Sequence, residues 1–168
     1  SFNIPTTGSA VLAPASNTSP LQLGSAYTML AWANMAADPA TWRTLFRTQP
    51  NDHPLLVQTG TNLIGYYDND SGGFQSYGLN ASTLGLVNTW AMYTVVGTGG
   101  NSICYINDGT STGTVAYNAA GLYQDAIGAA SGGSQGFGYV GYAAVYNRAL
   151  SASEIKQIYL SMKGRYGL

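Results

Sequence analysis

The sequence has few charged residues, a single cysteine and no long hydrophobic run, and each scarcity excludes a class of function. Charged residues make up 8% of the 168 residues, and the net charge is −1. Without a basic run the chain lacks the electrostatic footprint that phosphates require, so we predict no nucleic-acid partner. No stretch approaches the ~18 apolar residues of a membrane-spanning helix, so we predict no membrane insertion. The one cysteine, Cys104, excludes an intramolecular disulfide.

Residue types that perform catalysis are also scarce. Glycoside hydrolysis usually needs two carboxylates that flank the scissile bond. Glu154 is the only glutamate, and it ends the segment Ser-Ala-Ser-Glu, which fits a helix capping box. The one histidine, His53, cannot build the usual zinc site and has no nucleophile motif beside it. We therefore predict a protein without enzymatic activity.

Glycine and tyrosine are abundant, with 22 Gly and 13 Tyr. This composition is typical of short strands joined by many turns. Apolar or alternating runs bounded by turn residues predict a series of strands. The predicted strands are Tyr27–Met35, Thr44–Thr48, Leu55–Thr59, Asn62–Tyr67, Phe74–Leu79, Trp90–Val96, Ser102–Ile106, Gly113–Tyr117 and Tyr139–Tyr146.

The chain divides into a short lead-in and one domain. Residues 1–23 predict an extended N-terminal lead-in with one strand near Ala10–Ala13, and residues 24–168 predict a single sandwich domain. Only the stretch Ser151–Lys163 holds a helical apolar period with both caps, and Gly164 is expected to end it. The fold class that follows is all-β: a two-sheet antiparallel β-sandwich with one short C-terminal helix.

Three segments carry a family resemblance. Gly138–Ile155 combines the last strand with the capped start of the helix, and Tyr27–Trp32 is an early strand that ends in Trp. Trp90–Tyr93 and Ile103–Gly109 belong to a central hairpin. Together they resemble the concanavalin A-like lectin/glucanase superfamily in its laminin G-like branch, over about residues 24–168. The resemblance implies a concanavalin A-like jelly roll, with one sheet curved, in a domain used for glycan or protein recognition.

The chain departs from that branch in the closing strand and after Trp90. Where related sequences often carry an acidic pair in the closing strand, this chain has Gly141 and Tyr142, and the usual His after Trp90 is missing. The enzymatic relatives place Glu, Asp and Glu on alternating positions of one strand, and no strand here has that pattern. The resemblance therefore implies a binding domain rather than a glucanase.

Two predicted loops, residues 42–53 and 66–73, are the densest in aromatic, acidic and histidine side chains. Strand residues are committed to two facing sheets, so we expect ligand-binding side chains to gather at loop-bearing ends of the sandwich. An aromatic ring there can stack on a sugar while carboxylates or amides bind its hydroxyls. The predicted ligand-binding residues are Trp42, His53, Tyr66, Tyr67, Asp68 and Asp70, whereas Trp32 and Trp90 lie inside strands and are assigned to the core.

The segment Asp-Asn-Asp-Ser-Gly-Gly at residues 68–73 offers several oxygen ligands in a tight turn. Such a loop suits calcium, with Asp68 and Asp70 as the metal ligands, and calcium is the only cofactor that the sequence suggests. The same residues also fit an ordinary Asx turn, in which the carboxylate accepts backbone N–H groups. The sequence leaves both interpretations open.

The function favoured by these features is a non-catalytic carbohydrate-recognition or adhesion domain of an exported or virion-surface protein. The alternative is a structural virion component, such as a capsid-decorating, knob or tail protein, that uses the sandwich for assembly. Low charge and many small polar residues fit either hypothesis. The expected partners are accordingly a glycan, a cell-surface or capsid protein, or further copies of the chain in a homo-oligomer, at the cell exterior or on a virion.

Overall fold

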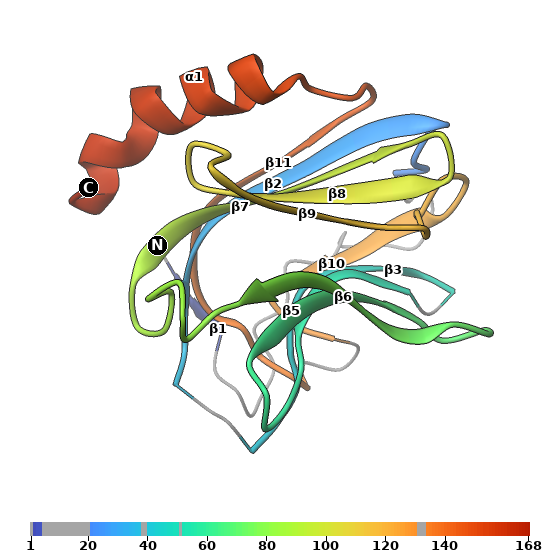
Figure 1. The fold of residues 1–168 in the computed structure, drawn as a ribbon, viewed down its shortest axis with the longest axis horizontal. Coiled ribbons are helices and arrows are strands. Elements are labelled where there is room, and N and C mark those ends of the chain that lie inside the picture. Colours follow the sequence, from blue (N-terminus) through green and yellow to red (C-terminus); the bar gives the residue numbers. More distant parts are fainter. Residues whose placement is uncertain (1, 5–20, 38–39, 51, 131–133) are drawn as a thin grey trace.

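The computed structural model describes residues 2–4, 21–37, 40–50, 52–130 and 134–168. These residues form two antiparallel β-sheets packed face to face and one α-helix outside them (Figure 1). The strands are β1 (Phe2–Ile4), β2 (Ala26–Met35), β3 (Arg43–Gln49), β4 (His53–Val57), β5 (Leu63–Asp68), β6 (Gly73–Asn80), β7 (Trp90–Thr98), β8 (Asn101–Ile106), β9 (Ser111–Val115), β10 (Tyr123–Ile127) and β11 (Gly138–Tyr146). The predicted antiparallel sandwich is confirmed.

The six-stranded sheet has the order β1-β11-β2-β7-β8-β9, and the five-stranded sheet has the order β10-β3-β4-β5-β6. Strand β2 lies between β11 and β7, and its central residues are all buried. One face of β2 meets the five-stranded sheet and the other lies beneath the helix, which explains its continuous apolar run. The space between the sheets holds the main core, in which Tyr93 meets Phe137 edge to face with ring centroids 5.2 Å apart.

Helix α1 (Ala152–Met162) begins at the predicted capping box. The Ser151 hydroxyl accepts from the backbone N–H of Glu154 at 3.3 Å, and the N–H of Ser151 donates to the Glu154 carboxylate at 2.8 Å. Glu154 also pairs with Arg148 at 2.6 Å, and these contacts lower the pKa of Glu154 to about 2. The glutamate therefore has a structural role at the start of the helix.

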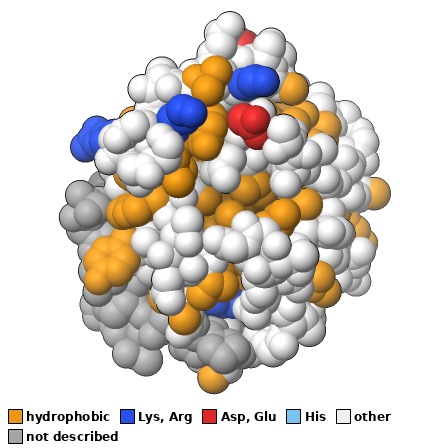
Figure 2. All heavy atoms as spheres, turned by 60° about the vertical axis from the view of Figure 1, so that its left-hand side comes forward, with side chains coloured by type: hydrophobic (Ala, Val, Ile, Leu, Met, Phe, Trp, Pro, Cys, Tyr) orange, Lys and Arg blue, Asp and Glu red, His pale blue; other side chains and the backbone are white. Residues whose placement is uncertain are grey.

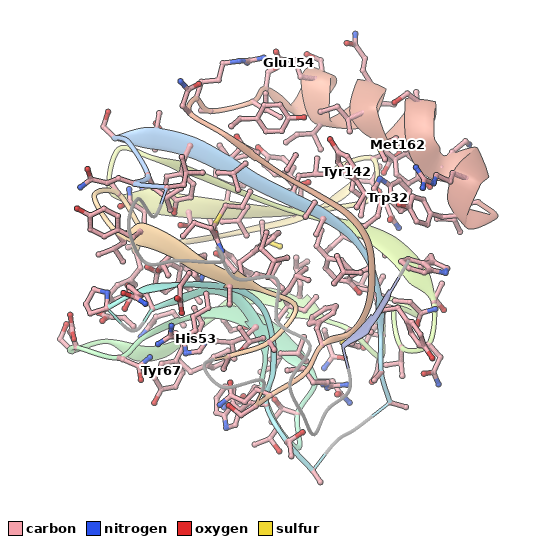
Figure 3. The ribbon with its side chains drawn as sticks, turned by 180° about the vertical axis from the view of Figure 1, so that it is seen from behind. Trp32, His53, Tyr67, Tyr142, Glu154 and Met162 are labelled. Carbon is pink, nitrogen blue, oxygen red and sulfur yellow. The ribbon has the colours of Figure 1, made fainter. Side chains whose placement is uncertain are left out.

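The helix covers the outer face of the six-stranded sheet and forms a second apolar layer there (Figures 1 and 3). Trp32 is fully buried in this layer and stacks on Tyr159 at 5.6 Å and on Tyr166 at 4.4 Å between ring centroids. Trp32 thus belongs to a core between sheet and helix, not to the space between the two sheets.

Three elements differ from the sequence-based expectations. Helix α1 ends at Met162, one residue before the predicted Lys163, and Gly164 does not cap it but lies in a 3-10 turn over Lys163–Tyr166, after which Gly167 has a positive φ of 78°. Strand β10 was not predicted, since its Gln124 and Asp125 break any apolar alternation. Strand β4 begins at His53, which is therefore a strand residue rather than a loop residue.

Trp90 was assigned to the core, but it is half-buried and packs against Tyr166 at 4.9 Å between ring centroids. The strand expected near Ala10–Ala13 lies outside the described residues. Residues 2–4 of the predicted lead-in form β1, which pairs with β11 at the edge of the six-stranded sheet.

Figure 2 shows one face of the molecule, on which hydrophobic side chains lie scattered among many uncharged polar groups and few charged ones. The large hydrophobic side chains that are at least one-third exposed include two tyrosines of β11, Tyr139 and Tyr142. No helix within the described part of the chain is long and apolar enough to cross a membrane.

Candidate functional site

A hollow of about 170 Å³ lies on the outer face of the five-stranded sheet, and we call it the outer hollow. Two of its residues, His53 and Tyr67, lie side by side beneath this sheet in Figure 3. Larger hollows of about 330 and 340 Å³ lie near Leu21 and near Tyr123, but neither is lined by any of the predicted ligand-binding residues. The outer hollow is lined by Trp42, His53, Leu56, Tyr67, Asn69 and Gln135.

The strand register explains why these side chains share one face. His53 of β4 is paired with Tyr67 of β5, and Tyr67 is paired with Phe74 of β6, which makes one row across the sheet. Thr44 of β3 is paired with Leu56 of β4, which makes a second row. Directly paired residues of an antiparallel sheet point to the same side, so both rows face away from the main core.

The aromatic rings of the first row meet edge to face. The ring of Trp42 lies 5.5 Å from that of Tyr67 at an interplanar angle of 88°, and 5.6 Å from that of Phe74 at 67°. His53 approaches Tyr67 in the same manner, with 6.3 Å between centroids. Trp42, His53 and Tyr67 are all only half-buried, so part of each ring is open to a ligand.

Trp42 precedes β3, and its neighbour Arg43 fixes the chain there. The Arg43 side chain is 1% exposed, donates to the carbonyl oxygen of Ala36 at 2.9 Å and also hydrogen-bonds the side-chain oxygen of Asn62. Charge-assisted bonds of this kind are stronger than neutral ones. The indole of Trp42 is therefore held beside the sheet by a buried anchor and not by a free loop.

His53 is joined to the segment after β10 through a threonine. Nδ1 of His53 lies 3.1 Å from the hydroxyl of Thr44, and that hydroxyl donates to Oε1 of Gln135 at 2.8 Å. The backbone N–H of Thr44 also donates to the carbonyl oxygen of Gln135 at 2.8 Å. Burial, and secondly the charge of Arg47, lower the pKa of His53 to about 4, so the imidazole is neutral at physiological pH.

The carboxylate of Asp68 organises the turn that carries Asn69. It accepts from the backbone N–H groups of Asp70 at 2.9 Å, Ser71 at 3.4 Å and Gly72 at 3.0 Å, and from the Ser71 hydroxyl at 3.1 Å. These bonds, the one from Asp70 foremost, lower the pKa of Asp68. The segment therefore adopts the Asx-type turn that the sequence allowed.

The predicted calcium site would use the same carboxylate oxygens as this turn. Both oxygens of Asp68 accept hydrogen bonds within the turn, so a calcium ion bound there would compete with these donors. Among the residues that the structure describes, no group of three or more His, Cys, Asp or Glu side chains is placed to share an ion. Calcium binding by Asp68 and Asp70 stays an untested prediction.

Of the predicted ligand-binding residues, Trp42, His53 and Tyr67 line the outer hollow. Asp68 and Asp70 are not among its lining residues, but they are the sequence neighbours of Asn69, which is. Tyr66 does not reach the outer hollow. Its ring is fully buried in the main core, where its hydroxyl donates to Asp52 at 2.6 Å.

One signal in the sequence distinguishes Tyr66 from Tyr67. Strand alternation around the buried Ile64 puts Tyr66 on the core face and Tyr67 on the outer face, so this pair could have been separated. Leu56 and Asn69 lie within or beside predicted elements, whereas Gln135 comes from a distant segment with no local signal.

The family model for the concanavalin A-like lectin/glucanases superfamily, of the laminin G type, matches residues 5–156. The chain belongs to this superfamily. The matched region begins inside the predicted lead-in of residues 1–23. A comparison with curated proteins finds no match.

Solved structures with this fold come from several kinds of protein. The Trypanosoma rangeli sialidase, in complex with the inhibitor DANA, matches with a TM-score of 0.60 and 14% identity, over 82% of this chain and 23% of that one. The botulinum neurotoxin serotype D binding domain matches with a TM-score of 0.55 and 14% identity, over 82% and 37%. The heptameric SAP-like pentraxin of Limulus polyphemus matches with 0.54 and 16%, over 89% and 80%. At these identities the likeness establishes the fold, and the chain spans only about a quarter of the sialidase.

Proposed function

We propose that this chain is a non-catalytic carbohydrate-recognition domain that holds a sugar in the outer hollow. The observation that carries the proposal is the meeting of Trp42, His53 and Tyr67 with the amides of Asn69 and Gln135 around one hollow. Aromatic rings can cover the C–H face of a sugar, while amide and imidazole groups can bind its hydroxyls.

The size of the hollow favours a small ligand group. Pockets for drug-sized ligands span roughly 300–1,000 Å³, and the outer hollow measures about 170 Å³. It therefore suits one terminal sugar, with the rest of a glycan extending into solvent. For a similar structure, that of botulinum neurotoxin type C, cell entry is described as dependent upon interaction with two ganglioside molecules, so interaction with a glycolipid is attributed to another protein of this fold.

The absence of catalysis is part of the proposal. The only glutamate, Glu154, caps helix α1 and lies on the opposite side of the sandwich from His53 (Figure 3). Asp68 is engaged in its turn, and its lowered pKa leaves it unable to act as a protonated acid at neutral pH. We propose that the domain belongs to an exported or virion-surface protein, a location that membership of the laminin G-type family model is compatible with.

The test is an array of immobilised glycans probed with the purified protein, with calcium and with a chelator. Binding of a defined set of terminal sugars that a soluble form of the same sugar competes away would support the proposal. Failure to bind any glycan, under both conditions, would remove it. Hydrolysis of a bound glycan would contradict the non-catalytic part alone.

Assembly as a structural virion component is the second candidate function. It is favoured by the exposed tyrosines of β11, since Tyr139 is 46% and Tyr142 is 37% exposed in a chain with few charges. Such surface is often buried between subunits. Light scattering over a wide concentration range tests it: a closed oligomer that dissociates in a Tyr139→Ser, Tyr142→Ser variant supports assembly, and a monomer at all concentrations opposes it.

A further inference from the structure

We propose that the outer hollow selects an uncharged sugar, one hydroxyl of which donates a hydrogen bond to Nε2 of His53. Thr44 and Gln135 hold the imidazole in the tautomer that makes this nitrogen an acceptor. The inference rests on the proposed carbohydrate recognition. It adds the charge class of the ligand and the protein atom that binds one of its hydroxyl groups.

The tautomer of His53 follows from two linked hydrogen bonds, in which each donor can point only one way. The amide oxygen of Gln135 can only accept, so the hydroxyl of Thr44 donates its single proton to it at 2.8 Å. The oxygen of Thr44 is then an acceptor for Nδ1 of His53 at 3.1 Å. A neutral imidazole carries one proton, so a proton on Nδ1 leaves Nε2 with a lone pair.

Nε2 is available to a ligand. Within the described part of the chain it has no hydrogen-bond partner, and it is not among the polar atoms shut away from solvent. The side chain is half-buried and lines the outer hollow. An acceptor nitrogen at the wall of such a hollow matches a sugar hydroxyl, which is a good donor.

The amides complete the match with a sugar. Because the oxygen of Gln135 faces Thr44, its NH2 group is turned away from that bond and can donate to a sugar oxygen. Asn69 offers a second amide at the same hollow. A hydroxyl group both donates and accepts, so a wall with one acceptor and amide donors fits it better than it fits a carboxylate, which only accepts.

Charge opposes an acidic sugar. No Lys or Arg is among the described residues that line the outer hollow, and the imidazole of His53 is neutral because burial lowers its pKa. Asp68 and Asp70 flank Asn69 in sequence and bring two carboxyl groups to the same turn. Arg47, the cation whose charge acts on His53, is paired with Asp125. A sialylated or sulfated sugar would therefore enter a site with no cation in its wall and like charges close by.

The first experiment reads the tautomer without any ligand. Because His53 is the only histidine, a long-range 1H–15N NMR spectrum at pH 7 reports its two ring nitrogens without assignment. We expect Nδ1 protonated and Nε2 bare in the parent protein, and a mixture of tautomers in Thr44→Val. Thr112→Val, which removes a hydroxyl bonded to Cys104 on the other sheet, should leave the spectrum unchanged. A protonated Nε2 in the parent protein would overturn the proposal.

The second experiment measures binding to pairs of glycans that differ only by a terminal sialic acid or sulfate. The neutral member should bind at least about tenfold more tightly. His53→Phe, which keeps an aromatic ring but lacks the acceptor nitrogen, should weaken binding of the neutral glycan by about tenfold. His53→Gln, whose amide oxygen can accept a hydrogen bond, should weaken that binding less.

The outcomes separate this inference from the proposed function. Equal or tighter binding of the acidic glycans, or unchanged binding by a folded His53→Phe variant, would overturn the inference and leave carbohydrate recognition standing. Failure of every glycan to bind would overturn both, while the NMR spectrum would still decide the tautomer.

Discussion

The two outer faces of the sandwich carry similar aromatic groups in different surroundings. On the six-stranded sheet Trp32 lies under helix α1, stacked between the sheet and two tyrosines and fully buried. On the five-stranded sheet Trp42 meets Tyr67 and Phe74 edge to face, and no helix of the described residues covers this sheet (Figure 1). Residue type alone therefore does not mark a site: the aromatic residues beneath the helix stabilise the fold, and those on the five-stranded sheet are available to a ligand.

The two outer faces also differ in the polar groups that stand beside their aromatic rings. Beneath the helix, apolar and aromatic side chains form one buried cluster, and the nearby hydroxyl of Thr28 is bonded to the backbone of Arg148 and Leu150. Around the outer hollow, the imidazole of His53 and the amides of Asn69 and Gln135 stand beside the rings. Aromatic rings that share a wall with convergent polar groups are typical of ligand sites, whereas rings without them are typical of packing.

Replacing the two tryptophans in turn gives the largest effect that tests this contrast. Trp32→Ala should lower the free energy of unfolding by about 3–5 kcal/mol, because it leaves a cavity between sheet and helix. Trp42→Ala, at a half-buried position, should lower it by about 1 kcal/mol. Urea unfolding followed by circular dichroism measures both. Equal losses would mean that the outer hollow is part of the core.

The protonation of His53 gives the next effect. Its folded pKa, about 4, lies below the ordinary value of 6.5, so the unfolded state takes up a proton first as the pH falls. The stability is therefore constant above about pH 6.5 and falls by about 1.4 kcal/mol per pH unit between there and about pH 4. Urea midpoints measured at pH 7, 6 and 5 test this window.

His53→Gln is the matched control for that experiment, since it removes the only histidine. The carboxyls with lowered pKa values, Asp68, Asp108 and Glu154, lose their contribution only at lower pH. Asp52, whose pKa is raised mainly by burial, is shared by both proteins and cancels in the difference. A parent protein and variant with parallel pH profiles would show that His53 titrates as it does in water.

Removing one ring from the outer face of the five-stranded sheet, which we call the open face, should weaken glycan binding. It should leave the packing beneath helix α1, on what we call the covered face, intact. Trp42→Ala is expected to weaken glycan binding by about tenfold, which corresponds to the ~1.4 kcal/mol of one lost aromatic contact. Trp90→Ala is the control, because Trp90 is also half-buried but packs against Tyr166 beside the helix. Isothermal titration with the best glycan measures both, and loss of binding in Trp90→Ala alone would place the site on the other face.

The covered face was easier to predict than the open one. A capping box and a helical period are local signals, so Ser151, Glu154 and the helix could be predicted from a few neighbouring residues. The strands followed from apolar runs for the same reason. The hydrogen-bonded link between Thr44 and Gln135 spans 91 positions, and no local pattern reports it.

Part of the open face was nevertheless within reach. Trp42, His53 and Tyr67 were predicted as ligand-binding residues because aromatic and polar residues crowd their segments, and they do line one hollow. The assignment of His53 to a loop was wrong since Pro50 and Pro54 read as turn residues, whereas Pro54 lies inside β4. Strand pairing, which sets His53 opposite Tyr67, is a long-range property that the sequence did not reveal.

The smallest effect concerns the turn that borders the open face. Asp70→Ala should change glycan binding less than about threefold, because Asp70 is exposed and contributes its backbone N–H, not its side chain, to the bonds with Asp68. Asp68→Ala removes the acceptor of three backbone N–H groups and should weaken binding by about fivefold, through displacement of Asn69. Adding calcium should change neither value if the carboxylate is committed to the turn. A parent protein that binds glycan only with calcium, and loses this dependence in Asp68→Ala and Asp70→Ala alike, would show instead that the turn reorganises around a metal ion.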